Sequence, residues 1–168
     1  MVTFPIVLPT YLRQWLVFTT DSEKEISFPK GSPFNAFLRV YLRHKRERES
    51  FAPADQDAVN IVIPKFPGKD PLYHNFLPEK ARQAFVNLIR DWFDAELFRS
   101  MSLFDKNCTP KRRQEFLLLW MEENGIDPDD RNFCAVNKRL QLLRQRAFDR
   151  SRKKRAYASR KVIKSISI

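Results

Sequence analysis

Basic side chains gather at the carboxyl end of this chain, where they could bind phosphate groups. Residues 131–168 carry 13 Lys and Arg against a single acidic residue, whereas residues 1–130 carry 18 basic and 19 acidic residues. The whole basic excess of the chain, whose formal net charge is +11, therefore lies at one end. Each Lys or Arg that neutralises a phosphate releases a counterion, so clustered basic residues favour binding to a polyanion. The alternative is a charged tail that only keeps a Phe-rich body in solution.

The basic residues fall into two groups that together predict a nucleic-acid interface. Three stand at the start of one expected helix, and the others lie in the next helix and just after it: Lys111, Arg112, Arg113, Lys138, Arg139, Arg144, Arg146, Arg150, Arg152, Lys153, Lys154 and Arg155. We expect most of them to contact phosphates and one or two arginines to reach guanine edges. Tyr157 is the only aromatic residue among the tail charges, which favours duplex DNA over single-stranded bases. RNA would meet the same charge pattern and stays open as a partner.

No pattern in the sequence predicts catalysis, a metal site or a cofactor. His44 and His74 do not belong to a metal-ligand spacing, and Gly68-Lys69 lacks the upstream glycine of a phosphate-binding loop. Cys108 and Cys134 have no neighbours typical of zinc ligands or of a thiolate nucleophile, and Cys134 is expected in the core. The carboxylates that could bind a metal are scattered without paired spacing: Asp55, Asp57, Asp70 and Glu79. We therefore expect a binding protein and not an enzyme.

Composition indicates a folded protein of ordinary domain size. The chain has 168 residues, of which 43% are hydrophobic, including 15 Phe, and this is too apolar for a disordered protein. Two Cys cannot build a disulfide scaffold. No apolar run approaches the roughly 20 residues that span a bilayer, and the N-terminus lacks the basic start of a secretory signal. We expect a cytoplasmic protein without a membrane partner.

Two helices joined by a tight turn are predicted in the last third of the chain. Thr109-Pro110 is a cap followed by a proline that suits the first helical position, and Gly125 suits the left-handed residue that closes the helix. Asp127 is expected to cap the next helix, with Pro128 at its first position, so that the connection has only about three residues. A Gly turn between two helices is typical of a helix-turn-helix, whose second helix enters the major groove. A plain helical hairpin with a basic extension is the alternative.

The second helix of this pair carries one apolar seam. Its members recur at spacings of three and four: Phe133, Val136, Leu140, Leu143 and Ala147. Such a seam can pack on the rest of the protein, or on a second copy, so a homo-oligomer or a protein-protein interaction module is a second hypothesis. Beyond Phe148 the seam ends, and a frayed basic tail is expected over residues 157–168.

The residues in front of this pair predict a small sheet covered by helices. Short strands are expected at 2–8, with Pro5 indicating an edge, and at 26–29 and 59–63. Helices are expected for about ten residues from Pro9, from the Ser32-Pro33 cap onward, and from about 77 to 100. The expected fold is α+β and mostly helical, with two or three short strands. Its parts are a body over 1–104, a helical pair over 105–156 packed on that body, and the tail.

Three short stretches carry a resemblance to a known group of proteins. They are Phe28-Pro29-Lys30-Gly31-Ser32, Ile61-Val62-Ile63-Pro64 followed by Lys69-Asp70, and Trp120 to Ile126. With these motifs the chain resembles small proteins of Bacteroidetes prophages and mobile elements, over most of residues 5–140. The resemblance implies no catalytic or binding residue. It implies a mobile-element setting, in which small basic proteins often manage DNA, and so a regulatory or accessory role.

Overall fold

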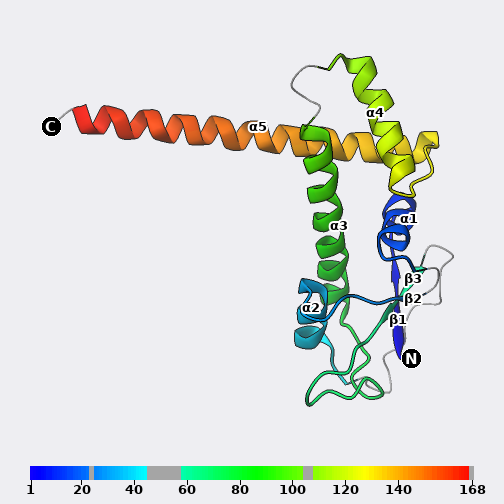
Figure 1. Cartoon of the computed structure of the whole chain (residues 1–168). Helices are drawn as coiled ribbons and strands as arrows, with labels where there is room; N and C mark the ends of the chain where they lie inside the picture. The colour runs from blue at the N-terminus through cyan, green and yellow to red at the C-terminus, as the bar shows by residue number, and fades with distance from the viewer. Residues whose placement is uncertain (23–24, 45–57, 104–107, 167–168) are drawn as a thin grey trace.

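The computed structural model describes residues 1–22, 25–44, 58–103 and 108–166, with the side chains of the last helix described as far as Lys154 and at Tyr157. Within these ranges the chain forms three short strands and five helices (Figure 1). In chain order they are β1 (Thr3–Val7), α1 (Thr10–Thr19), β2 (Glu25–Ile26), α2 (Pro33–Tyr41), β3 (Ala58–Val62), α3 (Glu79–Ser102), α4 (Pro110–Glu123) and α5 (Asp130–Ile166). The mostly helical α+β fold predicted from the sequence is confirmed.

The strands form one mixed sheet with β3 in the centre. β1 pairs with β3 antiparallel and β2 pairs with it parallel, so that Phe4 and Ile26 both lie beside Ile61. All three side chains are buried. Pro5 lies in an outer strand as predicted, because a proline has no N–H to donate to a second neighbour. β2 is shorter than predicted and ends before Phe28.

Two phenylalanines of α3, Phe85 and Phe93, lie at the centre of the aromatic part of the core. Many of the other aromatic residues of the chain pack around them. Four other phenylalanine rings surround Phe85, with centroids 5.5–6.2 Å away: Phe4, Phe28, Phe34 and Phe37. Two turns further along α3, the ring of Phe93 packs against Tyr11 and Trp15 of α1 and Trp120 of α4. The ring centroids are 5.2–5.8 Å apart. One face of α3 therefore binds the sheet and α2 at one end, and α1 and α4 at the other.

The predicted cap of α2 is present, and the helix buries one narrow apolar face. The backbone N–H of Asn35 donates to Ser32 Oγ at 3.3 Å. Phe34 and Leu38 are buried, whereas Tyr41 is 44% exposed and lies against Phe37. The sequence also predicts a loop over residues 50–58, nearly all of which lies outside the described residues.

Helix α4 begins and ends as predicted, whereas the start of α5 differs. Thr109 caps α4, and Gly125 has a φ of 69° that lets Ile126 N–H donate back to the Met121 carbonyl at 2.8 Å. Asp127 does not cap α5. Asp129 does, because its Oδ1 accepts from the Asn132 N–H at 2.6 Å. The connection therefore spans residues 124–129, twice the expected length.

Helix α5 crosses the end of the body and then projects away from it (Figure 1). It has 37 residues, which corresponds to a length of about 55 Å at the usual helical rise. Helix α5 is described as far as Ile166, and the frayed tail over residues 157–168 stays a prediction. No helix in the described ranges is both long and apolar enough to cross a membrane.

Candidate nucleic-acid interface

The first four residues of the apolar seam of α5 are covered by the protein's own body, whereas Ala147 does not pack on the core. Val136 and Leu140 are buried, and Phe133 and Leu143 are half-buried against the core. Their partners are on α3 and α1, the helices that α5 packs against most closely. Self-association through this seam, the second hypothesis from the sequence, would require α5 to leave the body. The seam instead fixes the base of a projecting helix.

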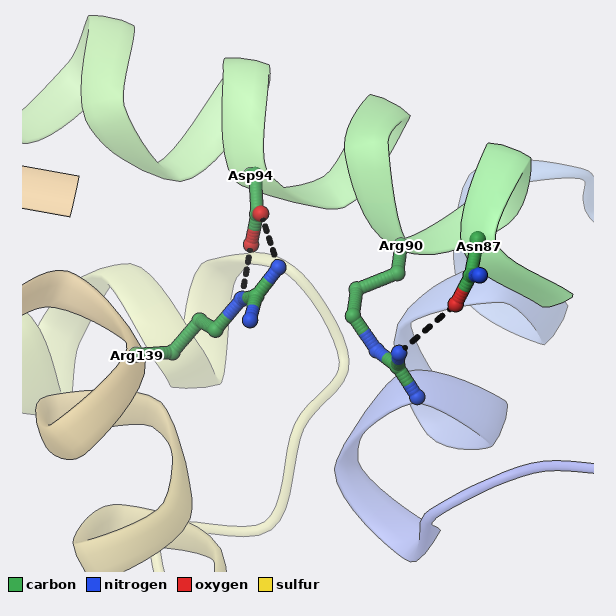
Figure 2. Close-up of polar contacts among 4 residues, drawn as sticks. All are labelled: Asn87, Arg90, Asp94 and Arg139. Atoms are coloured by element: carbon green, nitrogen blue, oxygen red, sulfur yellow. Dashed lines mark hydrogen bonds and ion pairs between the residues drawn. The ribbon is translucent and has the colours of Figure 1, made fainter. Parts of the chain in front are cut away.

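An ion pair inside this crossing fixes α5 further. Arg139 Nε donates to Asp94 Oδ1 at 2.6 Å, and Arg139 Nη2 donates to Asp94 Oδ2 (Figure 2). The Asp94 side chain is 8% exposed and that of Arg139 is 19% exposed, so both charges are largely shielded from water. The hydrogen bonds that Arg139 donates to Asp94 raise the pKa of Arg139, against the opposing effect of burial. Two parallel bonds between planar groups set both the position and the rotation of α5 on α3.

This ion pair changes the role of one residue in the predicted interface. The sequence places Arg139 with the phosphate-contacting residues, but its guanidinium is already bonded to a carboxylate of the body. Figure 2 shows the neighbouring Arg90 turned instead toward Asn87 of its own helix, at 2.9 Å. Arg139 therefore acts here as a positioning residue for α5. The sequence offers one signal for this role, because Asp94 falls between Phe93 and Leu97 on the apolar face of α3.

A polar cluster fixes the turn between α4 and α5 to α1. Gln14 Oε1 accepts from the Asp127 N–H at 3.2 Å and from Asn132 Nδ2 at 3.1 Å, and Gln14 Nε2 donates to the Asp127 carboxylate. Asn132 is buried and also donates to the Asp127 carbonyl at 3.1 Å. The Asp127 carboxylate is therefore bonded to Gln14 of α1. This explains why Asp129, and not Asp127, caps α5. Together with the ion pair, this cluster determines the direction in which α5 leaves the body.

The basic residues at the start of α4 lie close to the base of α5. Arg113 and Arg144 line one hollow between the two helices, of about 150 Å³, together with Asn137 and Gln141. Lys111 and Arg112 are exposed on the first turn of α4, next to this hollow. On α5, Lys138 is exposed and faces away from the seam. These five basic residues form the part of the candidate interface that is held on the body.

The remaining predicted interface residues lie on the projecting part of α5. We call this part, residues 146–155, the arm. Its described basic residues are all exposed: Arg146, Arg150, Arg152, Lys153 and Lys154. Arg155 belongs to the helix, and its side chain is outside the described ones. Successive residues of a helix turn by about 100°, so Arg152, Lys153 and Lys154 point in three different directions. The arm therefore presents positive charge all around its axis and not along a single stripe.

Three basic side chains on one side of the arm repel one another. Arg146, Arg150 and Lys154 follow one another at intervals of four, which places their charges next to each other on the helix surface. Asp149 is the only acidic residue of the arm, and it accepts a hydrogen bond from Gln145 at 3.3 Å. Like charges at this spacing destabilise an isolated helix by a few tenths of a kcal/mol per pair. A bound polyanion would remove this cost.

The remaining chemistry-bearing residues do not come together. His44 and His74 have ring centroids 6.0 Å apart, and Asp70 accepts from the Leu72 N–H in a local turn. Glu79 is paired with Arg82 at 3.5 Å. Among the described residues, no three His, Cys, Asp or Glu side chains gather as a metal site would require. Asp55 and Asp57 lie outside the described residues.

The two cysteines are separate and differ in their surroundings. Cys108 is half-buried and Cys134 is exposed, so the prediction that Cys134 belongs to the core is wrong. It stands two residues before the buried Val136, and a helix turns by about 200° over that interval. Cys134 therefore lies on the outer side of α5.

Compared with protein-family models, with curated proteins and with solved structures, the chain matches none of them. The candidate interface therefore rests on the geometry and charge of this chain alone.

Proposed function

We propose that this protein binds duplex DNA through the arm and through the basic residues at the junction of α4 and α5. The observation that carries the proposal is an exposed, almost uniformly basic helix whose base is fixed to a nearly neutral body by an apolar seam, an ion pair and a polar cluster. A helix of this kind can follow a groove or lie along a phosphate backbone while the body holds it in one direction. In keeping with the resemblance to mobile-element proteins, we propose a regulatory or accessory role.

The distribution of charge supports binding with modest sequence specificity. Charges on all sides of the arm can meet phosphates on both walls of a groove, and phosphate contacts carry no sequence information. Base reading would fall to residues on the outer side of α5 near the body, where Lys138 and Gln141 are exposed. We expect binding to many duplex sequences, with small differences between them.

The test is a salt titration of binding to a fluorescent 30-base-pair duplex. Engagement of about six phosphates gives a log–log slope near −5. A variant with Gln at 150, 152, 153 and 154 should flatten this slope by about 3.6, because four phosphate contacts are removed. A matched variant, with Gln at the exposed Lys30, Arg39, Lys65 and Lys80 of the body, loses the same charge and should leave the slope nearly unchanged. Equal effects of both variants would refute an interface on α5.

Competition identifies the kind of nucleic acid. We expect unlabelled duplex DNA to displace the probe more effectively than single-stranded DNA at fixed salt, because the arm has little aromatic surface for stacking. Duplex RNA is the informative competitor. If it displaced the probe at a tenfold lower concentration than duplex DNA, the protein would belong to the RNA-binding class.

A further inference from the structure

A second concave site lies on the body, away from the basic residues of α5. It is a cleft of about 730 Å³ between the end of α1, the chain from β2 to α2, and the middle of α3. This volume falls in the range of sites that hold small organic molecules. The lining is mainly apolar, and its largest members are Phe28, Phe34, Leu88 and Trp92.

Packed aromatic rings line the cleft, with Phe28 and Phe34 almost fully buried. Phe28 and Phe34 stack with centroids 4.2 Å apart and an interplanar angle of 16°, and Trp92 lies 5.4 Å from Phe34. Trp92 is held on its other side by Trp15 at 4.8 Å and remains half-buried, so part of its ring surface is available to the cleft. Rigid rings already packed in place lose little freedom when a flat molecule enters.

Asp91 gives the cleft its charge. Among the described residues that line the cleft it is the only ionisable side chain, and it is exposed. The nearby guanidinium of Arg139 is bonded to Asp94 and not to Asp91. Thr20 donates its hydroxyl proton to the Leu16 carbonyl, so its oxygen can only accept from a ligand in the cleft. One carboxylate and one accepting hydroxyl suit a donor that carries positive charge.

We propose that this cleft binds a small, flat aromatic molecule with a protonated amine. The ring would lie against Trp92 and the Phe28–Phe34 pair, and the ammonium would meet the Asp91 carboxylate. A cation close to the face of a tryptophan gains a further electrostatic contribution. This inference goes beyond nucleic-acid binding and does not depend on it. Because α3 carries both Asp91 and Asp94, the ligand would bind next to the ion pair that positions α5.

The test uses tryptamine as the probe and the full chain without DNA. Isothermal titration should give saturable binding in the millimolar range or tighter. The indole N–H signal of Trp92 in a two-dimensional NMR spectrum should shift with the same affinity, while that of the buried Trp120 should not. Indole-3-acetate, which has the same ring but a negative charge, should bind at least about fivefold more weakly.

Charge variants decide whether Asp91 selects the amine. Asp91→Asn should weaken tryptamine binding by about fivefold, and Asp91→Lys should reverse the preference in favour of indole-3-acetate. Glu123→Gln changes an exposed acid on α4 and should have no effect. Thermal melts confirm that each variant is folded, which is expected because Asp91 is exposed. The proposal is overturned if the folded protein does not bind tryptamine saturably. It is also overturned if Asp91→Asn binds tryptamine and indole-3-acetate as the unmodified protein does.

Discussion

Arg139 of α5 and Asp94 of α3 join the projecting helix to the body through two parallel hydrogen bonds, in a place that water barely reaches. Arginine and carboxylate are both planar, so this contact restricts the angle between the two helices as well as their distance. The direction of the arm is therefore a property of the core and not of the tail.

Removing one member of this pair should destabilise the protein more than removing both. Asp94→Leu leaves a guanidinium in an apolar crossing, and we expect a loss of about 1–3 kcal/mol in the free energy of unfolding. Adding Arg139→Met to Asp94→Leu should recover part of that loss, since no buried charge remains. Urea denaturation provides the measurement. Arg99→Gln, which breaks the more exposed Arg99–Glu96 pair, should cost less than about 1 kcal/mol. Additive losses in the double variant would show that the pair is not coupled.

The turn between α4 and α5 should tolerate no side chain at Gly125. Its φ of 69° disfavours any residue with a Cβ, and a Cβ placed there would lie 2.5 Å from the Phe18 side chain. We expect Gly125→Ala to cost well over the roughly 1 kcal/mol that a left-handed backbone alone imposes. Gly31→Ala is the matched control, because its φ is 81° but nothing lies within 4 Å. Thermal unfolding of both variants separates the clash from the backbone effect, and equal losses would exclude the clash.

The two aspartates of the same turn should respond differently to serine. Asp129→Ser keeps a side-chain oxygen that can accept from the Asn132 N–H and loses only the acceptor of the 3.2 Å bond from Asn132 Nδ2, so the cap survives and stability should change little. Asp127→Ser shortens the group that Gln14 contacts and should cost about 1 kcal/mol. Chemical denaturation distinguishes them. If Asp129→Ser were the more harmful change, Asp129 would do more than cap the helix.

Local signals in the sequence predicted the parts of the fold that depend on neighbouring residues. Ser32 and Thr109 begin their helices, and Gly125 ends α4, because capping and closure involve residues only three to five positions apart. The apolar spacing of Val136 and Leu140 likewise identified the buried side of α5. These features need no knowledge of the tertiary structure.

The predictions that differ from the structure depended on distant partners. Asp127 and Asp129 are equally good capping residues by type. Asp129 caps the helix because Asp127 is bonded to Gln14, which lies 113 positions earlier in the chain. Arg139 resembles the other arginines of α5 in the sequence, and only Asp94, 45 positions away, gives it another role. The role of the arm itself remains a proposal.

Tyr11 should make the stability of the protein sensitive to alkaline pH. Burial raises its pKa above the ordinary value of 10.0, although the nearby Arg90 and Arg139 act in the opposite direction. Above pH 10 the unfolded chain therefore loses this proton more readily than the folded one, and stability should fall as pH rises. Tyr11→Phe keeps the ring that contacts Phe93 and removes the ionisation. Its unfolding free energy should decline less steeply between pH 9 and 11, and an unchanged decline would remove Tyr11 as the cause.

Cutting the chain after Phe148 should separate the fold from the proposed function. The last seam residue that packs on the core is Leu143, and Arg146 and Phe148 are already exposed, so we expect residues 149–168, whose side chains are described only to Lys154 and at Tyr157, to contribute almost nothing to the body. We expect the free energy of unfolding to change by less than about 0.5 kcal/mol, because no buried contact is lost. Duplex binding should weaken by at least about a hundredfold at 100 mM salt, because most of the phosphate contacts lie in that segment. A large fall in stability would mean that the removed residues pack against the body. Unchanged duplex binding by the folded, shortened chain would assign the interface to α4 and the base of α5 alone.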